Sequence, residues 1–222
     1  MPSAWIVFSS TPYKMGAFIR GVLGARFNHV GLSLDPSLTF MSTFARRYVN
    51  APLVGGYVRE SFRRYHFHGR WAEIKVCRVD LTEQQMARLK RFLLVFERRS
   101  QKSLYNLFSA AAVPLKKRVR LHDSYTCVEF VGDALAYVGV PDFRYGGYHS
   151  LETMERRLSA HIEYIGSAKY YPGNKNWGDD SFPRRQKKRT VLKDTAGNLV
   201  RLSGRGLHTA CDACRRLLSK KR

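Results

Sequence analysis

Alternating apolar and polar residues recur through the first eighty positions, and this alternation is typical of strands with one buried face. The clearest case is HVGLSL, in which Val30, Leu32 and Leu34 share a face, followed by DPS, a tight-turn signal. The segment LTFMSTF after that turn is therefore expected to return antiparallel to the first strand. Further strands are expected at residues 4–9, 57–62 and 71–79.

Three helix signals follow. Thr82 begins the first, because Gln85 three residues later completes a capping box and apolar residues then recur at helical spacing. The stretch SYTCVEFVGDALAYVGVP predicts the second helix, with Gly139 placed to end it and Pro141 preventing its continuation. Ser150 can cap the third, LETMERRLSA.

Positive charge is unevenly placed along the chain. The net charge is +22, of which residues 172–222 carry +10. We therefore expect a domain at residues 1–171 and a basic C-terminal extension at 172–222, with a hairpin around AGN at 190–204 and a short terminal helix. The positive electrostatic potential of the basic tail should attract polyanions, either nucleic acid or an anionic membrane surface. The alternative is a basic surface that only keeps the protein in solution.

Sequence features also indicate where the protein is located and whether it holds a cofactor. No run of about 18 apolar residues is present, so no transmembrane segment is expected. The N-terminus MPSAWIVFSS lacks the basic region of a signal peptide, which favours a cytoplasmic or particle-associated protein. Cys211 and Cys214 follow His208 at spacings that a zinc site could use, but no second ligand pair follows, so no metal or other cofactor is expected.

Two polar residues stand at the beginnings of expected elements. Cys127 lies in the opening turn of the second helix, where Ser124 and Thr126 are candidate caps, and a helix N-terminus favours a thiolate. His29 begins the HVGLSL strand, a position from which an imidazole can be held against a helix terminus packed on the sheet. A buried apolar cysteine and a hydrogen-bonded polar histidine are the alternatives.

The ordered segments FNHVGLSLD, STFARRYVNAPLVGGYVRESF, YNLF and SYTCVEFVGDAL resemble the circularly permuted branch of the NlpC-type papain-like superfamily, which includes the YiiX-like proteins and a poxvirus homologue. In that branch the histidine strand precedes the cysteine helix, as His29 precedes Cys127. The resemblance covers residues 4–168. It implies an α+β fold, a small antiparallel sheet packed against helices, with Cys127 as nucleophile and His29 as base.

The sequence offers several candidates for the group that orients the imidazole. Relatives often place a carboxylate, amide or histidine on the strand after the one that bears the base, and LTFMSTF offers Ser42 or Thr43 there. Glu60 on the following strand is the nearest acidic candidate, and a main-chain carbonyl is a further alternative. Glu60 could instead form an ion pair with one of the many arginines.

Two classes of function follow. The first is a cysteine-dependent hydrolase or acyltransferase, of thiol protease or amidase type, that acts on an amide or ester through an acyl-thioester intermediate. Its substrate would be a peptide or a lipid. The second is a catalytically silent fold used as a basic structural or nucleic-acid-binding component of a larger particle. The sequence does not decide the oligomeric state.

Overall fold

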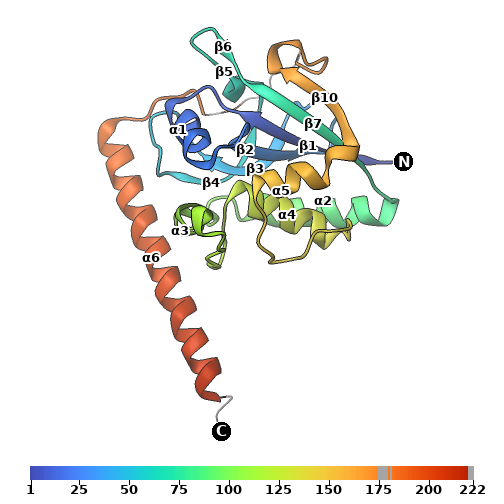
Figure 1. The fold of residues 1–222 in the computed structure, drawn as a ribbon. Helices are drawn as coiled ribbons and strands as arrows, with labels where there is room; N and C mark the ends of the chain where they lie inside the picture. Colours follow the sequence, from blue (N-terminus) through green and yellow to red (C-terminus); the bar gives the residue numbers. More distant parts are fainter. Residues whose placement is uncertain (175–179, 181, 220–222) are drawn as a thin grey trace.

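A computed structural model of the chain describes residues 1–174, 180 and 182–219, without the side chains of residues 15, 18, 19, 22, 23, 114, 208 and 210–219. The fold is α+β, and a six-stranded antiparallel sheet in the order β10-β7-β1-β2-β3-β4 forms its centre (Figure 1). The strands are β1 (Ser3–Ser10), β2 (His29–Ser33), β3 (Met41–Arg46), β4 (Gly55–Glu60), β7 (Glu73–Asp80) and β10 (Ile162–Ser167).

Short strand pairs lie outside the main sheet. Strands β5 (His66–Phe67) and β6 (Arg70–Trp71) form a hairpin that projects from the top of the molecule in Figure 1. Strands β8 (Leu104–Tyr105) and β9 (Ser124–Tyr125) pair in parallel, and β9 leads directly into helix α4. This pair therefore fixes the chain just before the predicted site cysteine.

The strands expected from alternation are all present. Strand β2 pairs with β1 from Trp5 opposite Ser33 to Ser9 opposite His29, and β3 returns antiparallel to β2 as the turn signal indicated. Strand β10 has no such signal in the sequence. It is an edge strand with several exposed residues, and it pairs only with β7.

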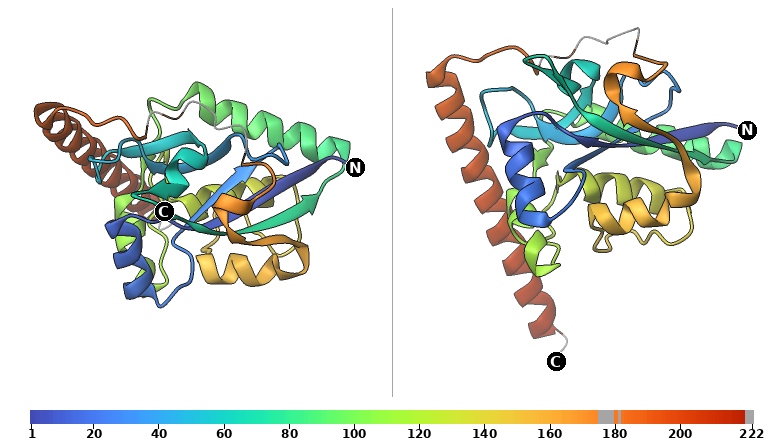
Figure 2. Two further views of the ribbon diagram at one scale, coloured as in Figure 1. Left: turned by 90° about the horizontal axis from the view of Figure 1, so that it is seen from above. Right: turned by 45° about the horizontal axis from the view of Figure 1, so that its top comes forward.

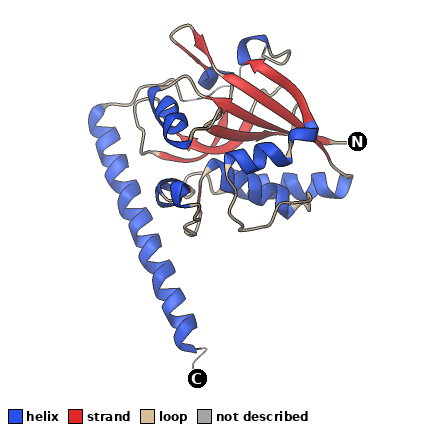
Figure 3. Ribbon diagram, in the orientation of Figure 1, coloured by secondary structure: helices blue, strands red, loops and turns tan. Residues whose placement is uncertain are grey.

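Helices cover the sheet on the side drawn below it in Figures 1 and 3. Apolar side chains of β1 and β2 pack there against α2 and α4 in the larger hydrophobic core. Capping boxes begin α2, α4 and α5, as predicted for the first of these from sequence. The helices are α1 (Lys14–Leu23), α2 (Glu83–Arg98), α3 (Leu107–Ala111), α4 (Cys127–Tyr137), α5 (Leu151–Arg157) and α6 (Lys188–Ser219).

A second, smaller core fills the opposite face of the sheet. Trp5, Val7 and Met41 from the strands pack there with Phe62 and Tyr65. Those two aromatic residues belong to the 3₁₀ turn Phe62–Tyr65, which follows β4 directly. The turn is therefore anchored in the core immediately beyond Glu60.

The expectation of a hairpin at residues 190–204 is wrong. Those residues lie within α6, a continuous helix of 32 residues that runs down one side of the molecule (Figures 1 and 2). Leu202 of this helix is 1% exposed and packs with Leu104 and Leu121, and Asn198 of the AGN triplet is also buried. These contacts with the domain outweigh the local turn preference of the triplet. Among the described residues, the helices lack an apolar stretch long enough to cross a bilayer.

Candidate active site

Cys127 is the first residue of α4, as the sequence predicted. Thr126 is the N-cap, and its side chain accepts a hydrogen bond from the Glu129 N–H while Glu129 accepts from the Thr126 N–H. An N–H in the first turn has no acceptor within its own helix, so the Cys127 N–H is available to an incoming oxygen. The capping box thus fixes both the thiol and a potential oxyanion donor at one point.

His29 begins β2, opposite Ser9 of β1, and its ring lies between a carboxylate and a thiol. Its Nε2 is 2.9 Å from Oε1 and 3.0 Å from Oε2 of Glu60. The Cys127 thiol is a further hydrogen-bond partner of the ring. All three side chains are buried.

Glu60 is the last residue of β4, and its carboxylate contacts Tyr65 and Arg64 as well as His29. The Tyr65 hydroxyl donates to its Oε1 at 2.9 Å, and the Arg64 guanidinium lies 4.0 Å from its Oε2. Burial alone would raise the pKa of this carboxyl, but the charge of His29 and its hydrogen bond lower it below the ordinary value. A Cβ at Gly31 would lie 3.2 Å from Oε1, so glycine there leaves room for the carboxylate.

The pKa of His29 is raised to about 10. Burial disfavours the charged ring, but the negative charge of Glu60, followed by hydrogen bonds to Cys127 and Glu60, outweighs it. The imidazole is therefore held as a cation near neutral pH. An imidazolium beside a sulfur is the arrangement from which cysteine nucleophiles react.

Of the three side chains considered as the orienting group, Glu60 is the one beside the imidazole. The Ser42 hydroxyl instead pairs with the Tyr57 hydroxyl at 3.0 Å, and Thr43 donates to the Val30 carbonyl at 2.7 Å. These hydrogen bonds direct both hydroxyls to other partners. The structure therefore brings Cys127, His29 and Glu60 together and leaves Ser42 and Thr43 outside the group.

Sequence reasoning missed the residues that support Glu60. Arg64 forms a buried ion pair with Asp180, at 2.7 Å from Nε to Oδ2 and 3.1 Å from Nη2 to Oδ1. Asp180 also accepts from the Ser61 N–H at 3.1 Å. The run ESFRRY after the strand was a local signal for Arg64 and Tyr65, but no sequence signal connects them to Asp180. The extension expected to start at residue 172 thus contributes directly to the surroundings of Glu60.

A cavity of about 220 Å³ adjoins this group. His29 and Glu60 line it together with the apolar side chains of Phe44, Leu53 and Leu107. Its volume is below the range of about 300–1,000 Å³ typical of pockets for drug-sized ligands. The cavity is therefore suited to one side chain or a short acyl group beside the histidine.

The other cysteines have no described role in this group. Cys77 is buried in β7, and burial raises the pKa of its thiol to about 12, which keeps it protonated and unreactive. The side chains of Cys211, Cys214 and His208 lie outside the described residues. Over the part of the chain that is described, no cluster of three or more His, Cys, Asp or Glu side chains could hold a metal ion.

Three comparisons, with models of protein families, with curated proteins and with solved structures, find no match for this chain.

Proposed function

We propose that this protein is a cysteine-dependent hydrolase or acyltransferase that acts on an amide or ester. The single observation that carries the proposal is the position of the His29 ring between the Glu60 carboxylate and the Cys127 thiol. Cys127 is the nucleophile, His29 the general base and acid, and Glu60 the group that orients the ring. This division of roles is the one that nucleophile–base–orienter groups use on unrelated folds.

We assign the fold to the permuted papain-like class as part of the same proposal. Chain order supports it, because β2 with His29 precedes α4 with Cys127. Spatial order supports it as well, because α4 packs against β2 and β3 of the antiparallel sheet. The support is the arrangement of these elements around the two side chains.

The first half of the reaction forms an acyl-enzyme. In the resting enzyme the proton already lies on His29, as an imidazolium–thiolate pair, and the Cys127 sulfur attacks the substrate carbonyl carbon to form a C–S bond while the carbonyl oxygen takes up the electron pair. The Cys127 N–H donates to that oxyanion. The oxyanion then collapses, the C–N or C–O bond breaks, and His29 protonates the departing nitrogen or oxygen.

The second half releases the acyl group. His29, now neutral, takes a proton from water or from another acceptor, which attacks the thioester carbonyl. The C–S bond breaks, the thiolate leaves, and the imidazolium–thiolate pair is restored. Water as the acceptor gives hydrolysis, and an amine or alcohol gives acyl transfer, so one site supports either outcome.

The cavity beside His29 indicates where the acyl part binds. Its apolar wall favours an apolar acyl group, while Arg46 at the same cavity adds a positive charge. A peptide carbonyl with an apolar side chain and a short fatty acyl ester both fit this description. The substrate is accordingly a peptide or a lipid with a small apolar acyl portion.

The test is covalent labelling read by peptide mass spectrometry. Iodoacetamide should alkylate Cys127 much faster than Cys77 at neutral pH, and His29→Ala should slow alkylation at Cys127 by about 10²-fold or more. A p-nitrophenyl ester should leave an acyl adduct on Cys127 that disappears in Cys127→Ser. Thermal melts of each variant separate a loss of reactivity from a loss of folding.

The proposal fails if a folded His29→Ala variant is alkylated at Cys127 as fast as the parent protein. It also fails if no ester of acetyl or octanoyl length acylates Cys127.

A further inference from the structure

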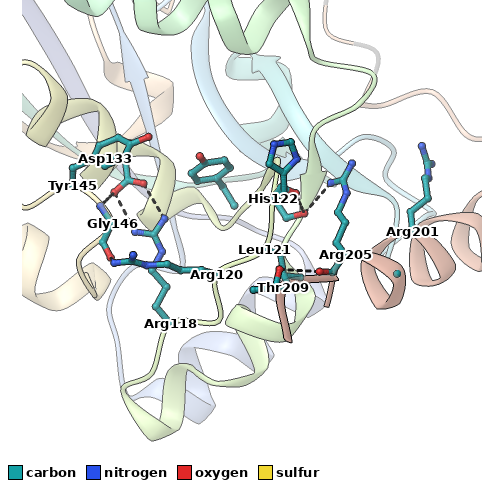
Figure 4. Close-up of a pocket in the computed structure, with 13 residues that line it drawn as sticks. Arg118, Arg120, Leu121, His122, Asp133, Tyr145, Gly146, Arg201, Arg205 and Thr209 are labelled. Carbon is teal, nitrogen blue, oxygen red and sulfur yellow. Dashed lines mark hydrogen bonds and ion pairs between the residues drawn. The ribbon is translucent and has the colours of Figure 1, made fainter. Parts of the chain in front are cut away.

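A second and larger pocket, of about 930 Å³, lies between α6 and the body of the molecule. Figure 4 shows two groups of side chains across it. Arg118, Arg120 and Tyr145 form one group, while Arg201 and Arg205 of α6 stand on the other side with His122. The pocket shares no lining residue with the cavity beside His29.

The guanidinium groups on the α6 side are held in place by neutral acceptors. Arg205 donates to the Asp123 carbonyl at 3.0 Å, to the Ser124 hydroxyl at 2.9 Å and to the Lys102 carbonyl at 2.7 Å. Arg201 donates to the Asn198 side chain at 2.7 Å and to the Gly197 carbonyl. These bonds fix the positions of both cations without neutralising them.

On the side of the pocket opposite α6, the positive charge of one arginine is neutralised and that of the other is not. Arg118 pairs with Asp133 at 2.8 Å, and both Asp133 oxygens are occupied by Arg118 and the Gly146 N–H. Arg120 donates to the Gly146 carbonyl. Four arginines line this pocket. Among the described residues, Arg118 is the one of the four that forms ion pairs. The positive charges of Arg120, Arg201 and Arg205 therefore line the pocket without ion pairs of their own in the described part of the chain, and the negative charge of Asp123 acts on Arg205 from nearby.

Exposed rings stand beside these charges. Tyr145 is 63% exposed, and the side chain of His122 is 80% exposed. Tyr125 also lines the pocket, but its ring packs against Phe44 and Phe96. His122 Nδ1 lies 3.4 Å from the Asp123 carboxylate, so Tyr145 is the exposed ring that is best placed to stack on a planar ligand.

We propose that this pocket binds a single strand of nucleic acid, with backbone phosphates on Arg120, Arg201 and Arg205 and a base stacked on Tyr145. Positively charged grooves with aromatic stacking platforms are the common means of binding single strands. The net charge of +22 raises the local concentration of such a ligand.

The shape of the site favours a strand over a membrane surface or a duplex. Of the three proposed phosphate ligands, Arg205 is only partly exposed while Arg120 and Arg201 are exposed, and all three line one recess, whereas the headgroups of a bilayer present a broad flat layer. A duplex keeps its bases stacked on one another and unavailable to Tyr145. An unpaired strand can enter the recess and offer both phosphate and base.

The first test measures fluorescence anisotropy of a labelled single-stranded oligonucleotide of about 12 nucleotides with the full chain. Arg120→Gln/Arg201→Gln should weaken binding roughly tenfold or more. The salt slope, which is the change of log K with log salt, should fall by about 0.7 for each phosphate that the variant no longer binds. The matched control, Arg189→Gln/Lys193→Gln, removes the same charge from exposed positions on α6 outside the pocket.

The second test concerns stacking. Tyr145→Ala should weaken binding about fivefold or more, and Tyr145→Phe should retain it. Tyr170→Ala is the control, because Tyr170 is 71% exposed and lies outside the pocket. Cys127→Ser should bind like the parent protein, so this result is independent of the proposed chemistry.

Equal weakening by the pocket pair and the control pair would overturn the proposal, since it would show only diffuse attraction. A duplex of the same sequence that binds as tightly as the single strand would also overturn it, and so would a Tyr145→Ala variant that binds the strand like the parent protein. If the pocket variants bind phosphatidylserine vesicles less well but the oligonucleotide equally well, the pocket is assigned to lipid headgroups instead.

Discussion

Both carboxylate oxygens of Glu60 lie within hydrogen-bonding distance of one nitrogen of His29, at 2.9 and 3.0 Å from Nε2. This contact sets the charge of the ring, because the carboxylate and the hydrogen bonds of the ring favour the imidazolium more strongly than burial disfavours it. The Cys127 thiol is a further partner of the same ring. The pair therefore couples the fold of the sheet to the protonation state of the candidate base.

Replacing Glu60 with Gln should lower the pKa of His29 from about 10 toward, or below, the ordinary value near 6.5. The negative charge is removed while burial remains, and burial favours the neutral ring. NMR titration of the histidine ring carbons measures this directly. A pKa that stays near 10 in Glu60→Gln would show that Glu60 is not the cause.

The raised pKa of His29 also predicts how the stability of the protein depends on pH. The folded chain binds the His29 proton more tightly than the unfolded chain, so this contribution is complete below about pH 6.5 and is lost as pH rises through about 10. Urea denaturation of the parent protein should therefore lose more stability over this interval than His29→Gln does. Parallel pH profiles for the two proteins would contradict the assignment.

Thr126→Ala should destabilise the protein by about 1 kcal/mol, because it removes the cap of α4. It should also slow alkylation of Cys127, which sits in the first turn of that helix. Thr82→Ala removes an equivalent cap from α2 and is the control. It should reduce the free energy of unfolding by a similar amount with no change in the alkylation rate, and equal slowing in both variants would contradict the prediction.

Asp180→Ala should destabilise the protein by about 3–5 kcal/mol, because it leaves the buried Arg64 charge without its close partner. Chemical denaturation measures the loss. Adding Arg64→Leu to this variant should restore part of the stability, since no unpaired charge then remains. A double variant less stable than Asp180→Ala would show that packing, and not the charge, is responsible.

Leu202→Ala should loosen the attachment of α6, because Leu202 is 1% exposed against Leu104 and Leu121. The cost of emptying such a site is about 2–5 kcal/mol, and limited proteolysis within α6 should accelerate accordingly. Leu207→Ala on the same helix is the control, since Leu207 is 70% exposed. Equal cleavage rates in the two variants would mean that Leu202 does not hold the helix.

Local sequence signals predicted the elements that carry the candidate site. The alternation after His29 and the cap before Cys127 were sufficient to place both residues at the starts of their elements, because strand and capping patterns act over a few positions. Their meeting was proposed from these two positions, with a buried apolar cysteine and a hydrogen-bonded histidine as the alternatives, and the family resemblance strengthened it. Glu60 could be proposed as the partner of the ring because it was the nearest acidic residue on a following strand.

The rest depended on contacts between distant parts of the chain. Nothing near Asp180 indicates that it pairs with Arg64, since the ion pair forms only after the C-terminal segment folds over the domain. The AGN triplet in α6 has turn character locally, and the burial of Leu202 and Asn198 determines its helical form. Strand β10 lacks a clear alternating pattern because it lies at the sheet edge.

Asp180 also keeps the Arg64 guanidinium from forming a close ion pair with Glu60. Arg64 lies 4.0 Å from Glu60 but makes its close contacts with Asp180. A protein cleaved after residue 174 would lose that competing carboxylate, and the guanidinium would then turn to Glu60. The histidine would then share its carboxylate with a permanently charged neighbour, so proteolytic removal of the C-terminal segment would lower the pKa of the imidazole from its value of about 10.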